Sequence, residues 1–263
     1  MKTEFYKIKC ITNMHVGTGE ANYSIVDREV EKDEVTGYPV IQSTGLKGAL
    51  RMVYANIADE TATEEIFGTE SGHGKDGIGS HKFLDGMFIS RPMRVYKSSK
   101  FPFLPTVSIA SVNQYLERLS AFGKNHYGID NIPDVDFGEN SFLTNVEEDV
   151  LVEGEPTGKL SGEVLGMLEK LGDVIGEHFA VAKTFDGYDL PVFPRTRLKD
   201  GKIGMGLWYE ERVPHESVFF FGVIYPDDAK KMDMPSIAQI GGNTSTGCGF
   251  VQITKLGEDG KNG

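Results

Sequence analysis

The first part of the chain alternates hydrophobic and polar residues. Residues 4–12 place Tyr6, Ile8 and Cys10 on one side, and a period of two is typical of a half-buried β-strand. The predicted strand leads into the glycine-rich stretch His15–Gly19. Similar patterns predict further extended segments at 25–30, 38–41, 82–89, 93–97, 207–211, 217–225 and 250–256.

A helical period begins after residue 42. Ser43 or Thr44 can cap the predicted helix. Lys47 and Arg51 stand four residues apart and therefore share one face of it. The apolar positions recur at helical spacing, at Leu46, Leu50, Val53 and Ile57.

Two more helices and several loops complete the pattern. Helical periodicity recurs at 108–122 and 161–175, with acidic, loop-rich sequence between them. Residues 68–80 and 239–249 are glycine-rich and predict loops. Residues 186–202 combine prolines with several basic side chains, and we interpret them as a protruding hairpin or arm.

Strands and helices mixed in this order favour an α+β fold, with a ferredoxin-like core, insertions and the projecting arm. The early strand, loop and helix and the late closing strand carry this prediction. We expect one domain over residues 1–257 and a disordered tail at 258–263. Sheets of this class commonly bind RNA on one face.

Composition excludes several classes of protein. The chain has 263 residues, of which 39% are hydrophobic and 25% charged, so it can bury a sizeable core. The longest strongly apolar run, Val218–Ile224, is too short to span a bilayer, and no signal core opens the chain, so we expect a cytoplasmic protein without membrane contact. Cys10 and Cys248 are the only cysteines, which argues against a disulfide framework and a structural zinc site.

The net charge of −12 opposes binding of nucleic acid by bulk attraction. Local basic groups can still act, because charges are screened beyond about 8 Å at physiological salt. The charge therefore indicates that RNA would be bound only within an assembly.

Two glycine-rich segments could hold phosphates. Gly45-Leu46-Lys47-Gly48 opens a helix whose free N–H groups carry partial positive charge, and Arg51 adds a full charge. An ordinary capped helix with a solvated basic face is the commoner meaning of this signal. Residues 240–249 offer backbone N–H groups with little side-chain bulk, as a phosphate nest requires, or a tight turn between strands. Neither these segments nor the other glycine-rich stretches match a nucleotide-binding fingerprint.

Asp27 follows the first glycine-rich stretch and is a candidate catalytic residue. Its carboxylate could hold a metal ion or accept a proton from a ribose hydroxyl, with His15 as donor or acid. The alternative is an Asp27 paired with Arg28 or another neighbour at a strand edge, which is the usual state of a lone aspartate. The residues alone leave both open.

Taken together, these segments resemble the repeated backbone subunit of type III-B (Cmr) CRISPR effector complexes, within the RAMP superfamily, which has a modified RRM-like core. The pieces occur in the family's order over almost the whole chain. The resemblance rests on His15–Gly19, Ile25–Asp27, Thr36–Ile41, Leu46–Arg51, Leu207–Glu211 and Ile240–Asn243.

The resemblance assigns roles to individual residues. It implies a target-cleaving Asp27 assisted by His15, and a thumb near 186–202 that wedges between guide and target RNA. The chain departs from the family at Cys248, where a basic residue is usual. The implied RNA-binding residues are Gly45, Lys47, Gly48, Arg51, Gly241, Gly242, Asn243 and Thr246.

The implied function is an endoribonuclease acting within an assembled complex for antiviral defence. It would bind guide RNA, cleave complementary single-stranded RNA at regular intervals, and use a divalent metal ion, magnesium or manganese. Its expected partners are both RNAs, copies of itself in a helical filament and other Cmr subunits. The alternatives are a non-cleaving structural subunit of the same complex and, less favoured by the acidic charge, a standalone nuclease that processes repeat RNA.

Overall fold

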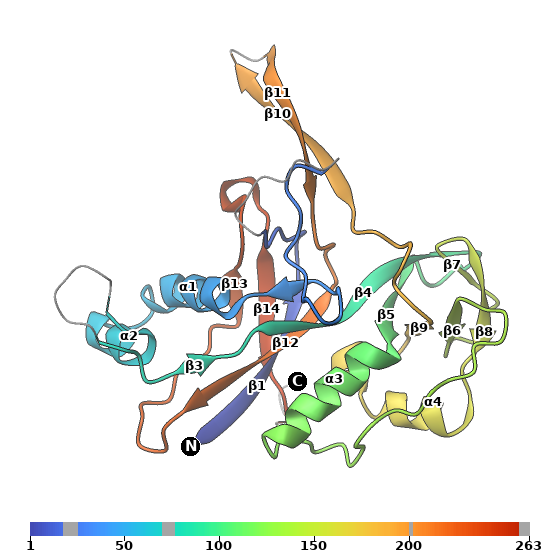
Figure 1. Cartoon of the computed structure of the whole chain (residues 1–263), viewed down its shortest axis with the longest axis horizontal. Coiled ribbons are helices and arrows are strands. Elements are labelled where there is room, and N and C mark those ends of the chain that lie inside the picture. Colours follow the sequence, from blue (N-terminus) through green and yellow to red (C-terminus); the bar gives the residue numbers. More distant parts are fainter. Residues whose placement is uncertain (18–25, 70–76, 200–201, 258–263) are drawn as a thin grey trace.

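The computed structural model describes residues 1–17, 26–69, 77–199 and 202–257. Within these ranges the chain has a mixed α+β fold, with one large sheet, few helices and a two-stranded ribbon projecting from the body (Figure 1). The strands of the large sheet are β1 Lys2–Cys10, β2 Val40–Ile41, β3 Lys82–Phe83, β4 Gly86–Tyr96, β5 Phe103–Ser108, β6 Phe142–Thr144, β7 Leu151–Val152, β8 Glu155–Lys159, β9 Ala180–Ala182, β12 Val218–Tyr225, β13 Ile237–Gln239 and β14 Phe250–Lys255. The helices are α1 Ser43–Tyr54, α2 Glu60–Phe67, α3 Ile109–Ala121, α4 Gly162–Glu169, α5 Gly172–Ile175 and the 3₁₀ turn η1 Thr244–Thr246.

The first strand of the chain, β1, and the last, β14, are neighbours in the large sheet. Its main order is β13-β14-β1-β12-β4-β5-β9-β6-β8-β7, and β1 pairs antiparallel with both β12 and β14. Strand β12 lies between β1 and β4, with Phe219 and Phe221 facing one core and Phe220 the other. Burial on both faces explains why its sequence is a continuous apolar run.

Helix α1 covers one face of the sheet. Leu46 and Leu50 are fully buried against Ile8 and Cys10 of β1, which confirms the predicted face of that strand. The predicted cap is wrong: the helix begins at Ser43, and the Asp85 carboxylate accepts a hydrogen bond from the Ser43 backbone N–H at 2.7 Å.

Helix α3 covers the opposite face and forms a second core. Tyr115 and Leu116 pack with Phe5 and Phe220, so β1 and β12 are buried from both sides. Ser108 caps this helix in a reciprocal pair with Ser111, which fixes where the chain turns from β5 into α3.

Several predicted boundaries differ from the structure. Residues 82–97 form β3 and the long strand β4, which continues through Pro92, instead of two similar strands. The predicted helix over 161–175 is divided into α4 and α5, and the first helix ends at Tyr54, so Ile57 is exposed. The pattern missed β5 and the short strands β6 to β8, although β5 pairs with the preceding strand β4 and β7 forms a tight hairpin with β8.

The projecting ribbon consists of β10 Val192–Lys199 and β11 Lys202–Glu211. The predicted arm, 186–202, has different bounds from this ribbon: residues 186–191 precede β10, and the returning strand continues to Glu211. Residues 207–211 are its returning strand and not a separate strand of the sheet. The predicted disordered tail, 258–263, lies outside the described residues.

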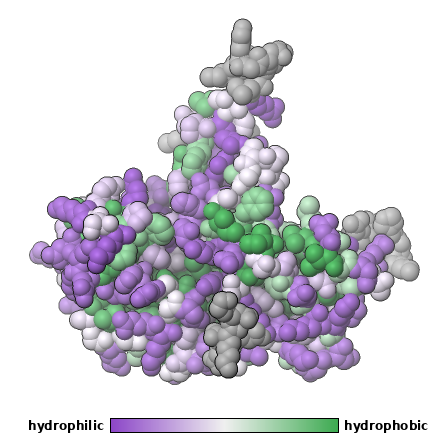
Figure 2. Space-filling view, turned by 180° about the vertical axis from the view of Figure 1, so that it is seen from behind, coloured by the Kyte–Doolittle hydropathy of each residue, from purple (hydrophilic) through white to green (hydrophobic). Residues whose placement is uncertain are grey.

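In the part of the chain that the structure describes, three apolar side chains are exposed on the β13–β14 side of the sheet. Register places Ile237 of β13 and Phe250 of β14 on the same face, and Ile11 donates its backbone N–H to Phe250; all three side chains are exposed. Figure 2 shows apolar surface gathered below the ribbon on the side seen from behind. Among the described helices, none has the length and apolar character needed to cross a bilayer.

The two faces of α1 should differ sharply in their tolerance of substitution. We expect Leu50→Ala to lower the free energy of unfolding by about 2–5 kcal/mol, because Leu50 is fully buried. Met52→Ala on the same helix is the matched control: Met52 is 74% exposed, so its effect should stay within about 0.5 kcal/mol. Chemical denaturation of both variants measures this, and equal losses would contradict the packing of α1.

Candidate functional site

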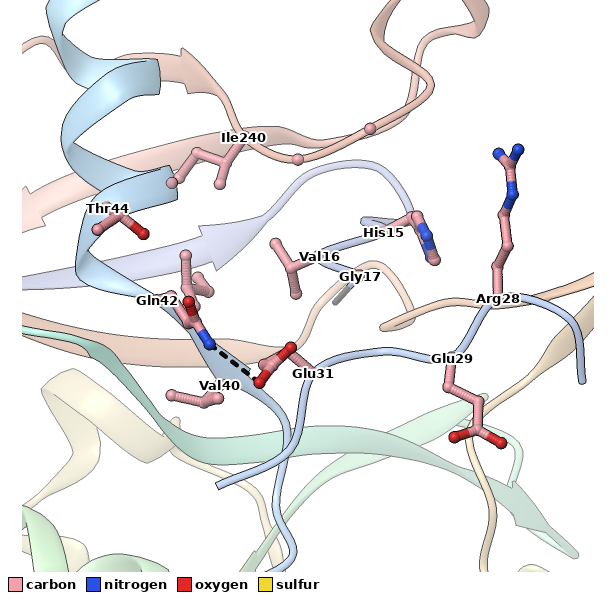
Figure 3. Close-up of a pocket in the computed structure, with 14 residues that line it drawn as sticks. His15, Val16, Gly17, Arg28, Glu29, Glu31, Val40, Gln42, Thr44 and Ile240 are labelled. Carbon is pink, nitrogen blue, oxygen red and sulfur yellow. Dashed lines mark hydrogen bonds between the residues drawn. The ribbon is translucent and has the colours of Figure 1, made fainter. Parts of the chain in front are cut away.

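A pocket of about 580 Å³ lies where the first glycine-rich stretch, the start of α1 and the C-terminal glycine-rich loop meet. It brings together the two segments that the sequence singled out as possible phosphate grips. Figure 3 shows His15 and Arg28 on one side of the pocket and a hydrogen bond from Gln42 to Glu31 on the other. Its lining residues are His15, Val16, Gly17, Arg28, Glu29, Glu31, Val40, Ile41, Gln42, Thr44, Gly45, Ile240, Gly241 and Gly242.

Glycine is required at two positions around His15. Gly241 has φ +87°, and a Cβ there would overlap the carbonyl oxygen of His15. A Cβ at Gly17 would lie 2.6 Å from the imidazole Nε2. Because neither glycine has a side chain, the C-terminal loop can approach His15 closely, and the neighbouring Gly242 donates its N–H to the His15 carbonyl at 2.8 Å. The glycines therefore serve close backbone approach, one of the uses that the sequence predicted.

His15 is buried and held in one orientation. Its Nδ1 lies 2.8 Å from the carbonyl oxygen of Glu211, so Nδ1 carries a proton and donates it. The other ring nitrogen, Nε2, is 3.8 Å from the nearest carboxylate oxygen of Glu210. His15 lines the pocket, and Nε2 is therefore the nitrogen left to exchange a proton there.

Asp27 is anchored to the same end of β11. Its Oδ2 accepts a hydrogen bond from the Tyr209 backbone N–H at 2.8 Å. Arg28 does not provide the partner that the alternative proposed, because its guanidinium lies over the Trp208 ring, 5.7 Å from the centroid. Tyr209 and Glu211 are two residues apart, so the anchors of Asp27 and His15 are about 7 Å apart along the strand.

Glu210 is a fully buried acid at the centre of this end of β11. It accepts a hydrogen bond from Arg212 at 3.0 Å and a short one from the Asn243 side chain. Burial alone would raise the pKa of its carboxyl, but these two hydrogen bonds and the charges of His15 and Arg212 hold it below the ordinary value. The buried carboxylate stays ionised and ties the C-terminal glycine-rich loop to β11.

Glu211 fastens the segment after Asp27. Its Oε2 accepts the backbone N–H of Val30 at 2.9 Å, and its Oε1 lies 3.5 Å from Lys32. Backbone bonds between Arg28 and both Tyr209 and Glu211 complete the junction. The candidate catalytic segment is therefore built onto the foot of the ribbon.

The residues of the predicted basic helix divide into two groups. Gly45 lines the pocket, whereas Lys47, Gly48 and Arg51 are not among its lining residues. Arg51 donates to the carbonyl of Gly68 and so joins α1 to the segment after α2. Lys47 lies near His81, whose pKa is lowered mainly by burial and further by the charge of Lys47.

The residues of the C-terminal glycine-rich loop also fall into two groups, those that line the pocket and those that do not. Gly241 and Gly242 line the pocket, whereas Asn243 turns its side chain inward to Glu210 and adopts φ +60°. Thr246 is exposed on η1 and donates to the Asn243 carbonyl at 2.9 Å. Cys248, at the position where the family usually has a basic residue, is buried.

Several site residues escaped the sequence analysis. Arg28, Gln42 and Thr44 line the pocket, and Figure 3 shows Arg28 and Glu29 pointing in opposite directions. The role of Glu210 was also missed. A signal existed in the two adjacent acids Glu210 and Glu211 next to an arginine inside a strand, because charged residues are rarely buried there unless paired.

A metal site formed by the protein alone is not apparent in the described ranges, where no three His, Cys, Asp or Glu side chains gather to ligate an ion. Asp27 offers one anchored carboxylate. A magnesium ion commonly uses one or two protein carboxylates and takes its other ligands from substrate phosphates and water. The donor set therefore fits an ion that arrives with RNA.

Comparison with known proteins supports the resemblance found in the motifs. The chain is 26% identical to the CRISPR system Cmr endoribonuclease Cmr4 of Pyrococcus furiosus, over 97% of this chain and 96% of that protein. Its fold matches the structure described as oligomeric Cmr4 from the same organism, with a TM-score of 0.69, 20% identity and coverage of 97% and 98%.

A second structural match is a chain of a type III-B Cmr-beta complex bound to cognate target RNA. The TM-score is 0.71 at 19% identity, and 97% of each chain is covered. The model of the RAMP superfamily matches residues 7–252, almost the whole chain. The chain therefore belongs to the RAMP superfamily.

Proposed function

We propose that this protein is a backbone subunit of a type III-B CRISPR complex that binds guide RNA and cleaves complementary single-stranded RNA at regular intervals. One observation carries the proposal: His15, the anchored Asp27 and the Gly241–Gly242 turn converge at the foot of the ribbon, beside one pocket. Membership of the RAMP superfamily and the likeness to Cmr4 over 97% of the chain support it.

We interpret the core as ferredoxin-like. The strands β14, β1, β12 and β4 are neighbours, and α1 lies between β1 and β4 in sequence. This is the order of last, first, third and second strand in that fold, with irregular chain at 226–236 in place of its second helix. The β10–β11 ribbon would be the thumb, and the remaining strands insertions in one domain.

The guide would be held by its backbone and not by its sequence. The Gly241–Gly242 turn and the first turn of α1 both line the pocket, where their main chain can approach a phosphate closely, and Arg28 adds a cation. Base pairing would then select the target, as in other RNA-guided systems. Lys47 and Arg51 do not line the pocket, so their contact with RNA stays a prediction.

Cleavage would follow when the ribbon separates a target nucleotide from its neighbours. Its 2′-oxygen attacks the adjacent phosphorus as the bond to the 5′-oxygen breaks, leaving a 2′,3′-cyclic phosphate and a 5′-hydroxyl. Asp27 accepts the proton of the 2′-hydroxyl, and His15 supplies one to the departing 5′-oxygen through Nε2. Alternatively, Asp27 and RNA phosphates would hold a magnesium or manganese ion, which would stabilise the negative charge on the phosphate.

The partners follow from the same proposal and from the charge. An acidic chain with a net charge of −12 attracts little free RNA, so further copies in a helical filament and other Cmr subunits would complete the binding surface. A backbone subunit that binds RNA without cutting is the alternative. It would keep every contact to RNA but lack metal-dependent cleavage.

The first prediction tests the catalytic carboxylate. We expect Asp27→Asn to lower single-turnover cleavage of target RNA by an assembled complex by about 10²- to 10⁴-fold, because the proton acceptor is lost. Asparagine can still accept the Tyr209 N–H, so guide and target affinity should be unchanged. Glu34→Gln, an exposed acid outside the pocket, is the control; cleavage by Asp27→Asn at the wild-type rate would sink the assignment.

The second prediction concerns the metal ion. Chelation with EDTA should abolish cleavage while leaving target binding in place, and added magnesium or manganese should restore it. Gel analysis of cleavage products and a parallel filter-binding measurement separate the two effects. Undiminished cutting in EDTA would show that Asp27 acts without a divalent ion.

The third prediction tests the C-terminal turn with two alanine substitutions. Gly241 and Gly247 both have positive φ, +87° and +81°, but only a Cβ at Gly241 meets another atom within 4 Å. Gly247→Ala should show only the backbone strain, about 1–2 kcal/mol. Gly241→Ala should also displace the turn from His15 and weaken guide RNA binding more strongly. Equal guide affinity for the two variants would argue against this turn as a grip.

A further inference from the structure

A second cavity, of about 250 Å³, is lined in part by residues 185–190, which precede the first strand of the ribbon. It is formed where the turn at 36–39, strand β4 and the segment 185–190 meet, just before the chain rises into β10 (Figure 1). It shares no lining residue with the pocket at His15. Its main side chains are Lys32, Tyr38, Phe88, Arg91, Phe185 and Tyr188.

Aromatic rings dominate this cavity. Tyr38, Phe88 and Phe185 form a triad with ring centroids 5.4 to 5.6 Å apart. Phe88 is buried and forms the floor, whereas Phe185 and Tyr188 are half-buried at the opening. A flat aromatic group could therefore enter and stack against a ring.

Arg91 adds a cation with unused hydrogen-bonding capacity. Its guanidinium lies 5.7 Å from the centroid of Phe185, and one terminal nitrogen donates to the Asp189 carbonyl at 3.3 Å. Its Nε is buried and has no partner among the described residues. A ligand carbonyl oxygen could accept from the terminal N–H groups of Arg91, and a planar ring could stack with the guanidinium.

The rim distinguishes between possible ligands. The carboxylates of Asp186 and Asp189 are exposed at the opening, so a phosphate inside the cavity would be repelled. An uncharged base would not be, and carboxylates can accept hydrogen bonds from exocyclic amino groups. Lys32, also on the rim, could meet the phosphate left outside.

The cavity is also next to the proposed cleavage site. Lys32 lies 3.5 Å from the carboxylate of Glu211, whose carbonyl holds the His15 ring. The segment 185–190, which forms one wall, continues into the ribbon. The backbone N–H of Arg212, just after β11, donates to the Pro191 carbonyl at 3.0 Å. A nucleotide displaced by the ribbon would therefore be near this opening.

We propose that this cavity receives the nucleobase of an RNA nucleotide that the ribbon has unstacked, with the base held by Phe185, Tyr188 and Arg91. The inference rests on the proposed function, since it requires RNA at the ribbon. It adds a receiving site for the displaced base, which would hold the nucleotide open and orient its ribose.

Photocrosslinking locates the base. Target RNAs with single 4-thiouridine substitutions are bound to the complex assembled with guide RNA, irradiated and digested with trypsin. We expect crosslinks to the peptide 184–195 or to 33–47, at Phe185, Tyr188 or Tyr38, from one target position per subunit. Crosslinks absent from both peptides, or equal from all positions, would overturn the proposal.

Binding measurements test the energetic role. Replacing the crosslinked nucleotide by an abasic one should weaken binding to the wild-type complex by about 5- to 150-fold, the range for one stacked base. With Phe185→Leu, which keeps an apolar side chain but removes the ring, the same abasic change should cost less than about twofold. An abasic penalty that is unaltered in this variant would contradict the proposal.

Phe101→Leu provides the matched control. Phe101 is another half-buried phenylalanine of the neighbouring core, beside His178 and outside the cavity. Its variant should keep the wild-type abasic penalty, and thermal unfolding checks that both variants fold. If Phe101→Leu abolishes the penalty too, the effect is one of packing and the proposal fails. Because binding is measured, this failure would leave the cleavage test of Asp27 unaffected.

Discussion

His15 is the residue on which the arrangement of the site depends. Its ring donates to the Glu211 carbonyl and its own carbonyl accepts from Gly242, so one residue joins the first glycine-rich stretch, the foot of the ribbon and the C-terminal loop. Both contacts are possible only because Gly17 and Gly241 lack a side chain that would overlap it. Without this junction the pocket would lose the wall that the three segments share.

Buried charge reinforces the same junction. Glu210 is fully buried, with Arg212 and Asn243 as hydrogen-bond partners, and Glu211 holds the backbone of Val30. Removing one partner of such a pair leaves an uncompensated buried charge, which typically costs about 3–5 kcal/mol. The polar network therefore orients the foot of the ribbon more specifically than apolar packing could, because hydrogen bonds restrict direction as well as distance.

The acidic composition of the chain does not conflict with the proposed RNA-binding pocket at His15. The carboxylates at the foot of the ribbon are used internally: Asp27 accepts from the Tyr209 N–H, Glu210 from Arg212 and Asn243, and Glu211 from the Val30 N–H. Arg28 remains exposed at the pocket. Local geometry thus offers donors to a phosphate backbone despite a net charge of −12. Lys32, which lines the second cavity, lies 3.5 Å from the Glu211 carboxylate at the foot of the ribbon, so the proposed function places the holding of RNA and the displacement of a base close together.

The sequence by itself determined the features that depend on local periodicity and on motif order. The alternation of Tyr6, Ile8 and Cys10 predicted the buried face of β1, the spacing of Leu46 and Leu50 predicted that of α1, and the ordered motifs identified the family. Only the tertiary structure decided which residues meet. Asp27 contacts a residue 182 positions away and His15 one 196 positions away, and no local pattern encodes such pairs. The full extent of the ribbon and the inward turn of Arg51 toward Gly68 likewise depend on the path of the chain, because packing against distant segments selects among conformations that the local sequence permits equally.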